Sequence, residues 1–180
     1  MVLTMGNSDN FVIRKAMQAD VPMLVEFLAR LALHVVGTSS HTLKKKERNR
    51  LMATLQSSLS DPDKLLVVAE TDDARLVGMG YLYVWRNQGI WEQSGDVEFK
   101  SGIIDDVWVE PDFRKLGIFS AILRELLAFA KSHAINELIL EYSTSNKEAA
   151  ATWKKLGFQP TGVRAAAFTS VVQEALEKRR

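Results

Sequence analysis

The segment from Arg114 to Phe119 places an arginine and a glycine between a strand-like run and an amphipathic helix. The first turn of a helix carries N–H groups without intrahelical partners and the positive end of the helix dipole. Gly117 would let a bound group approach the backbone, and Arg114 adds a fixed charge whose donors suit phosphate oxygens. This spacing predicts a phosphate-binding loop, although a helix start with an exposed arginine is an equally good interpretation.

Two adjacent aspartates, Asp105 and Asp106, lie before this loop and could accept a proton from a reacting group. Successive residues of a regular strand point to opposite faces, so the two carboxylates should not share one pocket. The structural alternative for either residue is a hydrogen-bonded carboxylate at the end of a strand.

Strands and helices alternate around these residues. The β-branched run 103–109 ends at a Glu-Pro-Asp turn signal, and a further apolar run at 138–142 follows the helix, which predicts a right-handed strand–helix–strand unit. The helix between them has an apolar stripe with helical period at Phe119, Ile122, Leu123, Leu126, Leu127 and Ala130. Upstream, the pattern predicts a strand at 11–14, helices after Asp20 and at 43–59, and a hairpin of strands at 65–70 and 76–85.

The motif Val-x-Pro-x-x-Arg-x-x-Gly-Ile, from Val109 to Ile118, is followed by Asn146-x-x-Ala149 and by Leu-Gly-Phe at 156–158. This combination resembles the GNAT superfamily of acyl-CoA-dependent N-acetyltransferases. The resemblance extends over residues 11–168 and is more specific in the second half. It implies an α/β fold with a mixed, mostly antiparallel sheet, a splayed parallel central strand pair and flanking helices, formed by a single domain over residues 1–180.

The resemblance also implies that acetyl-CoA is a co-substrate. The residues that match the family's cofactor contacts are Val107, Trp108, Val109, Arg114, Lys115, Leu116, Gly117, Ile118, Phe119, Ser120, Asn146 and Trp153. Asn146 could equally be the N-cap of the helix that follows it.

Two residues depart from the family pattern. Phe119 stands where Gly or Ala is usual, and Trp153 stands where many members have a tyrosine that protonates the departing thiolate. An indole N–H is no useful acid at neutral pH. Either Tyr142, Ser143 or a water replaces that tyrosine, or the thiolate leaves unprotonated, which a thiol pKa near ~8.5 permits.

The implied reaction is transfer of an acetyl group to a primary amine of a small molecule or peptide, by direct attack in a ternary complex. Because an alkylammonium has a pKa near ~10.4, it must lose a proton before it attacks. By its position in the family-like strand, Asp106 is the first candidate base, with Asp105 and Glu98 as alternatives. The polar stretch 86–102 is a candidate wall of the acceptor pocket, or an ordinary surface loop. A catalytically weak acyl-CoA sensor, which Trp153 would favour, is the alternative function.

Composition narrows the other classes of function. The chain has 180 residues, 47% of them hydrophobic, which suits one domain with a sizeable core. Its net charge of +1 argues against a nucleic-acid binder. It contains no cysteine, its three histidines have no metal-ligand spacing, and no run approaches the ~20 apolar residues of a membrane span. We therefore expect a cytoplasmic protein without a metal site; the segment 171–180 could form a short helix that meets a second subunit in a homodimer.

Overall fold

The computed structural model of the protein describes residues 11–36, 43–86, 100–162 and 166–178. The chain divides into two compact units, Met1–Glu141 and Tyr142–Arg180. The first unit contains five strands: β1 (Phe11–Lys15), β2 (Lys64–Thr71), β3 (Leu76–Arg86), β4 (Lys100–Val109) and β5 (Glu137–Leu140). Its helices are α1 (Val21–Val36), α2 (Lys45–Leu59) and α3 (Ile118–Ser132). The second unit contains α4 (Lys147–Lys155) and α5 (Thr169–Glu177).

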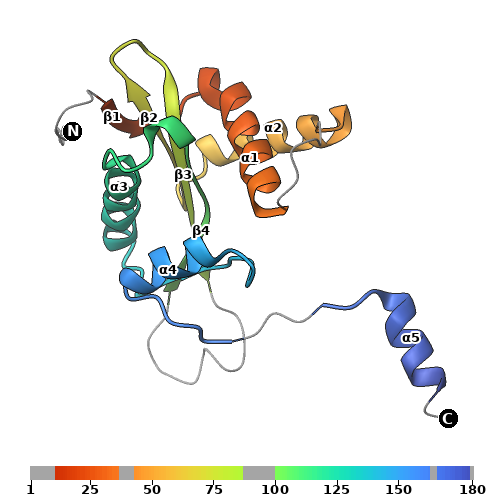
Figure 1. Cartoon of the computed structure of the whole chain (residues 1–180). Coiled ribbons are helices and arrows are strands. Elements are labelled where there is room, and N and C mark those ends of the chain that lie inside the picture. Colours follow the sequence, from red (N-terminus) through yellow and green to blue (C-terminus); the bar gives the residue numbers. More distant parts are fainter. Residues whose placement is uncertain (1–10, 37–42, 87–99, 163–165, 179–180) are drawn as a thin grey trace. The chain divides into compact units, whose positions relative to one another are not determined.

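The five strands form one sheet in the order β1-β2-β3-β4-β5. The first four pair antiparallel, whereas β4 and β5 are parallel because α3 connects them. Helices α1 and α2 cover one face of this sheet and α3 covers the other (Figure 1). The predicted fold class is confirmed, and so are the predicted positions of these strands and of the helices α1, α2 and α3 within a few residues.

Helix α3 packs directly on β3 because glycines lie beneath it. Its apolar stripe, which includes Ile118, Ile122 and Leu126, is buried. A Cβ added at Gly80 would lie 2.4 Å from Ile122 Cγ2, so only glycine fits at this contact. The apolar stripe of α3 therefore packs on the glycine-containing face of β3 and forms one apolar interface.

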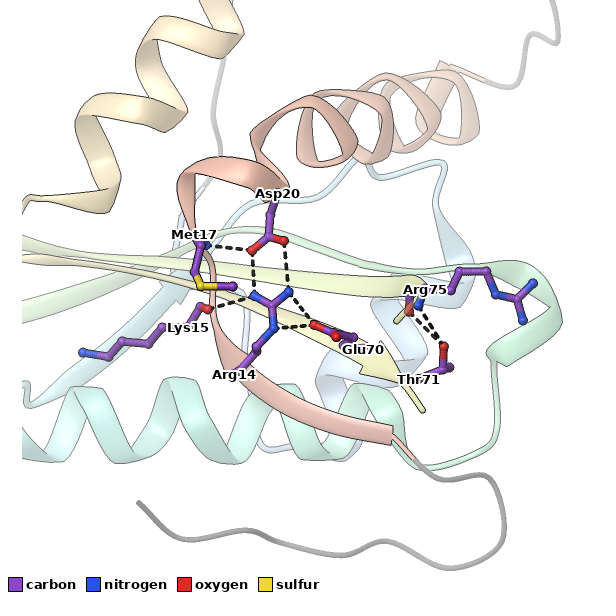
Figure 2. Close-up of polar contacts among 7 residues, drawn as sticks. All are labelled: Arg14, Lys15, Met17, Asp20, Glu70, Thr71 and Arg75. Carbon is purple, nitrogen blue, oxygen red and sulfur yellow. Dashed lines mark hydrogen bonds and ion pairs between the residues drawn. The ribbon is translucent and has the colours of Figure 1, made fainter. Parts of the chain in front are cut away.

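The opposite face is anchored by Arg14 of β1. Its guanidinium binds both carboxylate oxygens of Asp20, with Nη1–Oδ2 and Nη2–Oδ1 distances of 2.7 and 3.0 Å, and also donates to Glu70 of β2 (Figure 2). The buried Asp20 carboxylate also accepts the Met17 backbone N–H at 2.7 Å. Hydrogen bonding to Arg14 lowers the pKa of Asp20, and the same bond raises the pKa of Arg14. This ion pair fixes the turn from which α1 starts.

Candidate functional site

Strand β4 contains a β-bulge at the two candidate bases. Tyr81 of β3 pairs with Asp106 and Leu82 pairs with Ile104, so Asp105 is an extra residue on β4. Such an insertion interrupts the alternation of side chains along a strand. The expectation that the two aspartates point to opposite faces assumed a regular strand, and this strand is irregular at that point.

Asp106 and Trp108 lie on the face of the sheet covered by α1 and α2. Asp106 is paired with Tyr81, and Trp108 with Met79; Tyr81, Met79 and Trp108 all belong to the core cluster formed with α1 and α2. The hydroxyl of Tyr81 is 3.2 Å from that of Ser58 in α2. The buried indole nitrogen of Trp108 has no hydrogen-bond partner in the part of the chain that the structure describes. This face of the sheet therefore combines a carboxylate, a hydroxyl and an unsatisfied donor.

The carboxylates of the bulge have unusual electrostatics. Burial, together with the negative charge of Asp105, raises the pKa of Asp106 to about 7. Partial burial and the charge of Glu141, which follows β5, raise the pKa of Asp105. Burial and then the charge of Asp105 raise the pKa of Tyr83. Asp106 thus exchanges its proton in the neutral range, where a general base is most effective.

Sequence reasoning did not find Tyr81, Tyr83 or Glu141 as neighbours of these aspartates. The two tyrosines alternate along β3 as core aromatics would, and Glu141 is the residue after a short strand. Only the pairing of β3, β4 and β5 brings them to the bulge. The third candidate base, Glu98, lies outside the described residues.

Strands β4 and β5 pair over a short distance. Their parallel register runs from Ser101 opposite Glu137 to Ile104 opposite Leu140. Strand β5 ends there, whereas β4 continues to Val109. Among the described residues, no strand pairs with the edge of β4 next to Asp105–Val109 on this side. Backbone groups at such an edge could bind an extended ligand.

The loop after β4 contains two residues with positive φ. Lys115 and Gly117 have left-handed conformations, with φ of +66° and +89°. Gly117 is the N-cap of α3 and makes no side-chain capping bond. Among the described residues, a Cβ added at Gly117 would meet nothing within 4 Å, so the position of that Cβ is open. Leu116, Gly117 and Ser120 are exposed, Ile118 is buried and Phe119 is half-buried.

The side chain of Arg114 contacts two residues at the end of β4. Its Nε donates to the Val109 carbonyl oxygen at 3.2 Å, and its Cζ lies 5.2 Å from the centre of the Trp108 ring. The ring of Trp108 is also 6.0 Å from that of His34 in α1, in an edge-to-face arrangement. The guanidinium therefore contacts a side chain on the α1 and α2 face of the sheet.

The remaining predicted site residues belong to the second unit. The Asn146 side chain accepts the Ala149 N–H at 3.0 Å and is the N-cap of α4, which was the structural interpretation of this residue. Trp153 packs edge-to-face against Phe158 with ring centres 5.3 Å apart. Tyr142, the candidate acid, has a 40% exposed side chain.

A family model for the acetyltransferase (GNAT) family matches residues 30–158, which is more than half of the chain. This chain belongs to the GNAT acetyltransferase family. The resemblance inferred from the loop and the Asn146 segment is confirmed. Membership implies acyl-CoA-dependent N-acetyltransferase activity in general.

One curated relative of this GNAT chain is the putative ribosomal protein bS18-alanine N-acetyltransferase of Bacillus subtilis (strain 168), which is 28% identical over 88 residues. The match covers 49% of this chain and 55% of the relative, so the chain spans about half of that protein's length.

Solved structures share the fold over almost the whole GNAT chain. A predicted acetyltransferase from Clostridium acetobutylicum, solved with acetyl-CoA, has a TM-score of 0.71 at 21% identity, covering 88% of this chain and 96% of that one. Glucosamine-6-phosphate N-acetyltransferase from Arabidopsis thaliana has a TM-score of 0.63 at 21% identity, covering 89% and 99%. At such identities the likeness shows the fold.

Two further properties concern only the described residues. No cluster of three or more His, Cys, Asp or Glu side chains among them could hold a metal ion. None of the helices they form is long and apolar enough to span a bilayer.

Proposed function

We propose that the protein transfers an acetyl group from acetyl-CoA to a primary amine of a small molecule or peptide, by direct attack in a ternary complex. The observation that carries this proposal is the half-buried Asp106 carboxylate, whose pKa of about 7 suits a general base. It lies at the bulge of β4, beside the strand edge that β5 leaves unpaired. A carboxylate there can deprotonate an ammonium close to a thioester bound along β4.

The reaction then balances without a covalent enzyme intermediate. Asp106 takes one proton from the ammonium, directly or through water. The amine nitrogen attacks the thioester carbonyl carbon, the C–S bond breaks, and coenzyme A leaves as a thiolate. The second proton that the nitrogen loses passes to this thiolate, through water or Tyr142, so the products are the amide and the coenzyme A thiol. Backbone N–H groups of Val107–Val109 would stabilise the negative charge that develops on the carbonyl oxygen. The chain has no cysteine that could carry the acetyl group instead.

The loop fits the phosphates of coenzyme A. The space in front of Gly117 is open, and the N-terminus of α3 lies directly behind it. Helix N-termini favour phosphate through their free N–H groups and dipole. Asn146 and Trp153 are further candidate contacts, and Tyr142 a candidate acid for the thiolate; these roles come from the family pattern.

The acceptor class follows from the charges near the bulge. The charge of Glu141 raises the pKa of Asp105, and the charge of Asp105 raises the pKa of Asp106. A cationic amine bound nearby would reduce the repulsion among these carboxylates. Peptide N-termini and amino sugars are the first acceptors to test, because relatives carry names for acetylation of an alanine and of glucosamine 6-phosphate. A cytoplasmic location, the absence of nucleic-acid partners and a homodimer stay predictions.

The first test is calorimetric titration of the wild-type protein with acetyl-CoA, repeated on Gly117→Ala. The substitution strains a backbone at φ +89° and puts a methyl group into the open space, so acetyl-CoA should bind more weakly. Absence of saturable binding by the folded wild-type protein would sink both the transferase and the sensor interpretation.

The second test measures release of the coenzyme A thiol with a panel of amines. Asp106→Asn should lower kcat/KM by roughly 10²–10⁴-fold while the Kd for acetyl-CoA stays unchanged. The wild-type kcat/KM should rise with pH through about 7, and the variant should lack this limb. Asp72→Asn, at an exposed turn position, is the matched control. A fully active Asp106→Asn variant would mean that Asp105 or Glu98 is the base. Binding of acetyl-CoA by the wild-type protein without turnover of any amine would favour the sensor.

A further inference from the structure

Strand β4 presents different residues to the two faces of the sheet. Gly78 and Gly80 of β3 face α3, since a Cβ at either would contact Ile122. Their partners on β4 are Val109 and Val107, which therefore share the α3 face. Trp108 and Asp106 occupy the other face, under α1 and α2. Figure 1 shows α3 on one side of the sheet and these two helices on the other.

Arg114 belongs to the loop that leads into α3, yet its guanidinium reaches the opposite face. The Nε bond to the Val109 carbonyl directs the side chain back along β4, and the guanidinium lies against the Trp108 ring. Flat stacking and a directed Nε donor are properties that arginine has and lysine lacks. The space in front of Gly117, where phosphates would lie, is at the start of the α3 face.

We infer that Arg114 is a positioning residue for the acceptor half of the site, which acts by holding Trp108 beside Asp106, and that it is not the phosphate ligand that its place in the motif suggests. The inference rests on the proposed function, because it assigns a residue to one substrate of that reaction. It differs from the sequence-based prediction, which gave Arg114 to the cofactor.

The state of Trp108 supports this role. Its ring is held on two sides, by Arg114 and by His34, and its side chain is 6% exposed. Its indole N–H has no partner among the described residues. Among the described residues, the ring is therefore positioned by packing contacts, Arg114 and His34 among them, and by no hydrogen bond. Without Arg114, the ring could turn toward a partner and change the wall next to Asp106.

The test compares Arg114→Met with Arg124→Met, the same substitution at a position outside the proposed site. Arg124 is an exposed residue of α3. For Arg114→Met we expect the KM of the amine to rise about tenfold, while the calorimetric Kd for acetyl-CoA changes by less than about threefold. For Arg124→Met we expect an unchanged KM of the amine.

Three results would overturn the inference. One is a tenfold or greater loss of acetyl-CoA affinity in Arg114→Met with an unchanged KM of the amine, as a phosphate ligand requires. Another is an equal change of the amine KM in Arg124→Met, because the effect would then be one of charge. The third is full rescue by Arg114→Lys, which keeps the charge and loses the planar group. If Arg114→Met does not fold, Arg114→Lys decides the question through the same two constants.

A double-mutant cycle tests whether Arg114 acts through Trp108. In a Trp108→Leu background, Arg114→Met should change the amine KM by no more than about twofold, because the ring it holds is absent. If Arg114→Met raises the amine KM by the same factor in the wild-type and the Trp108→Leu backgrounds, Arg114 does not act through Trp108. A smaller fraction of folded protein would lower the apparent kcat but leave the amine KM and the Kd for acetyl-CoA unchanged. It therefore cannot account for a change in the amine KM. These results differ from a failure of the proposed function. If the proposed function is wrong, the wild-type protein will not bind acetyl-CoA.

Discussion

The face of the sheet under α3 is apolar and closely packed, whereas the face under α1 and α2 contains polar groups within its core. Under α3, Ile118, Ile122 and Leu126 are almost fully buried against glycines of β3. Under α1 and α2, the Tyr81 hydroxyl, the Trp108 indole and the Asp106 carboxylate lie among apolar side chains. Burial of polar groups is costly unless they are paired, so the second face gives up stability that the first retains.

The polar face itself contains two differently treated carboxylates. Asp20 is bound by Arg14 and by a backbone N–H, and hydrogen bonding lowers its pKa. Asp106 has its pKa raised by burial, with Asp105 adding repulsion. A carboxylate stabilised as an anion serves the fold, whereas one held near neutrality is available for proton transfer. This difference is why we predict proton transfer at the bulge, on the α1 and α2 face.

The packing of the α3 face should be the most sensitive to substitution. Gly80→Ala places a methyl group 2.4 Å from Ile122 Cγ2 and 3.2 Å from Val67 Cγ2. We expect a loss of about 3 kcal/mol in the free energy of unfolding, the upper range for overpacking. Denaturant unfolding measures it, with Gly162→Ala, which meets nothing within 4 Å, as the control. Adding Ile122→Leu, which removes the Cγ2 branch, should recover part of the loss; strict additivity would refute the contact.

The paired carboxylate of the polar face comes next. Asp20→Asn keeps an acceptor for the Met17 N–H and removes the charge that binds Arg14, which retains Glu70. We expect a loss of about 2 kcal/mol at pH 7, because charge-assisted bonds in a buried site become neutral ones. The folded-state pKa of Asp20 lies below its ordinary value, so this contribution is present above pH 4 and is lost as the pH falls through the folded pKa.

Urea titrations at pH 7, 5 and 3 would follow the difference between wild type and Asp20→Asn. The gap should be constant between pH 7 and 5 and narrow at pH 3. The exposed Asp112→Asn is the control and should have no such gap. A gap that widens in acid would mean that Asp20 is not stabilised as an anion.

The two faces also differ in how far the sequence predicts them. The helical period of α3 and the β-branched run of β4 are local patterns, and they predicted the strand, loop and helix around Gly117. The family motif added the prediction that this loop binds phosphate. The Arg14–Glu70 contact joins residues 56 positions apart and depends on the pairing of β1 with β2, which no local pattern specifies.

The bulge at Asp105 has the same origin. An inserted residue leaves the composition of a strand unchanged, and only the register against β3 shows that Asp105 has no opposite residue. The alternation rule assumes a regular strand, and this assumption fails at the two candidate bases. Arg114 is a related case, because the motif defines its position in the loop and the contact with Trp108 defines its direction.

The smallest expected effect is on stability, because the ionised Asp106 carboxylate destabilises the folded protein. Its folded-state pKa of about 7 lies above its ordinary value of 3.8, so the folded state holds a proton that the unfolded state has lost between these pH values. Stability therefore falls as the pH rises through this window, and the cost is complete above pH 7. Asp106→Asn should stabilise the protein at pH 8 by on the order of 1 kcal/mol, a fraction of the full linkage energy because solvent reaches the carboxylate. At pH 4 the variant and the wild type should unfold at nearly the same urea concentration.

A variant that is less stable than the wild type at pH 8 would show that the anion has stabilising partners, and Asp106 would then resemble Asp20, a carboxylate that stabilises the fold.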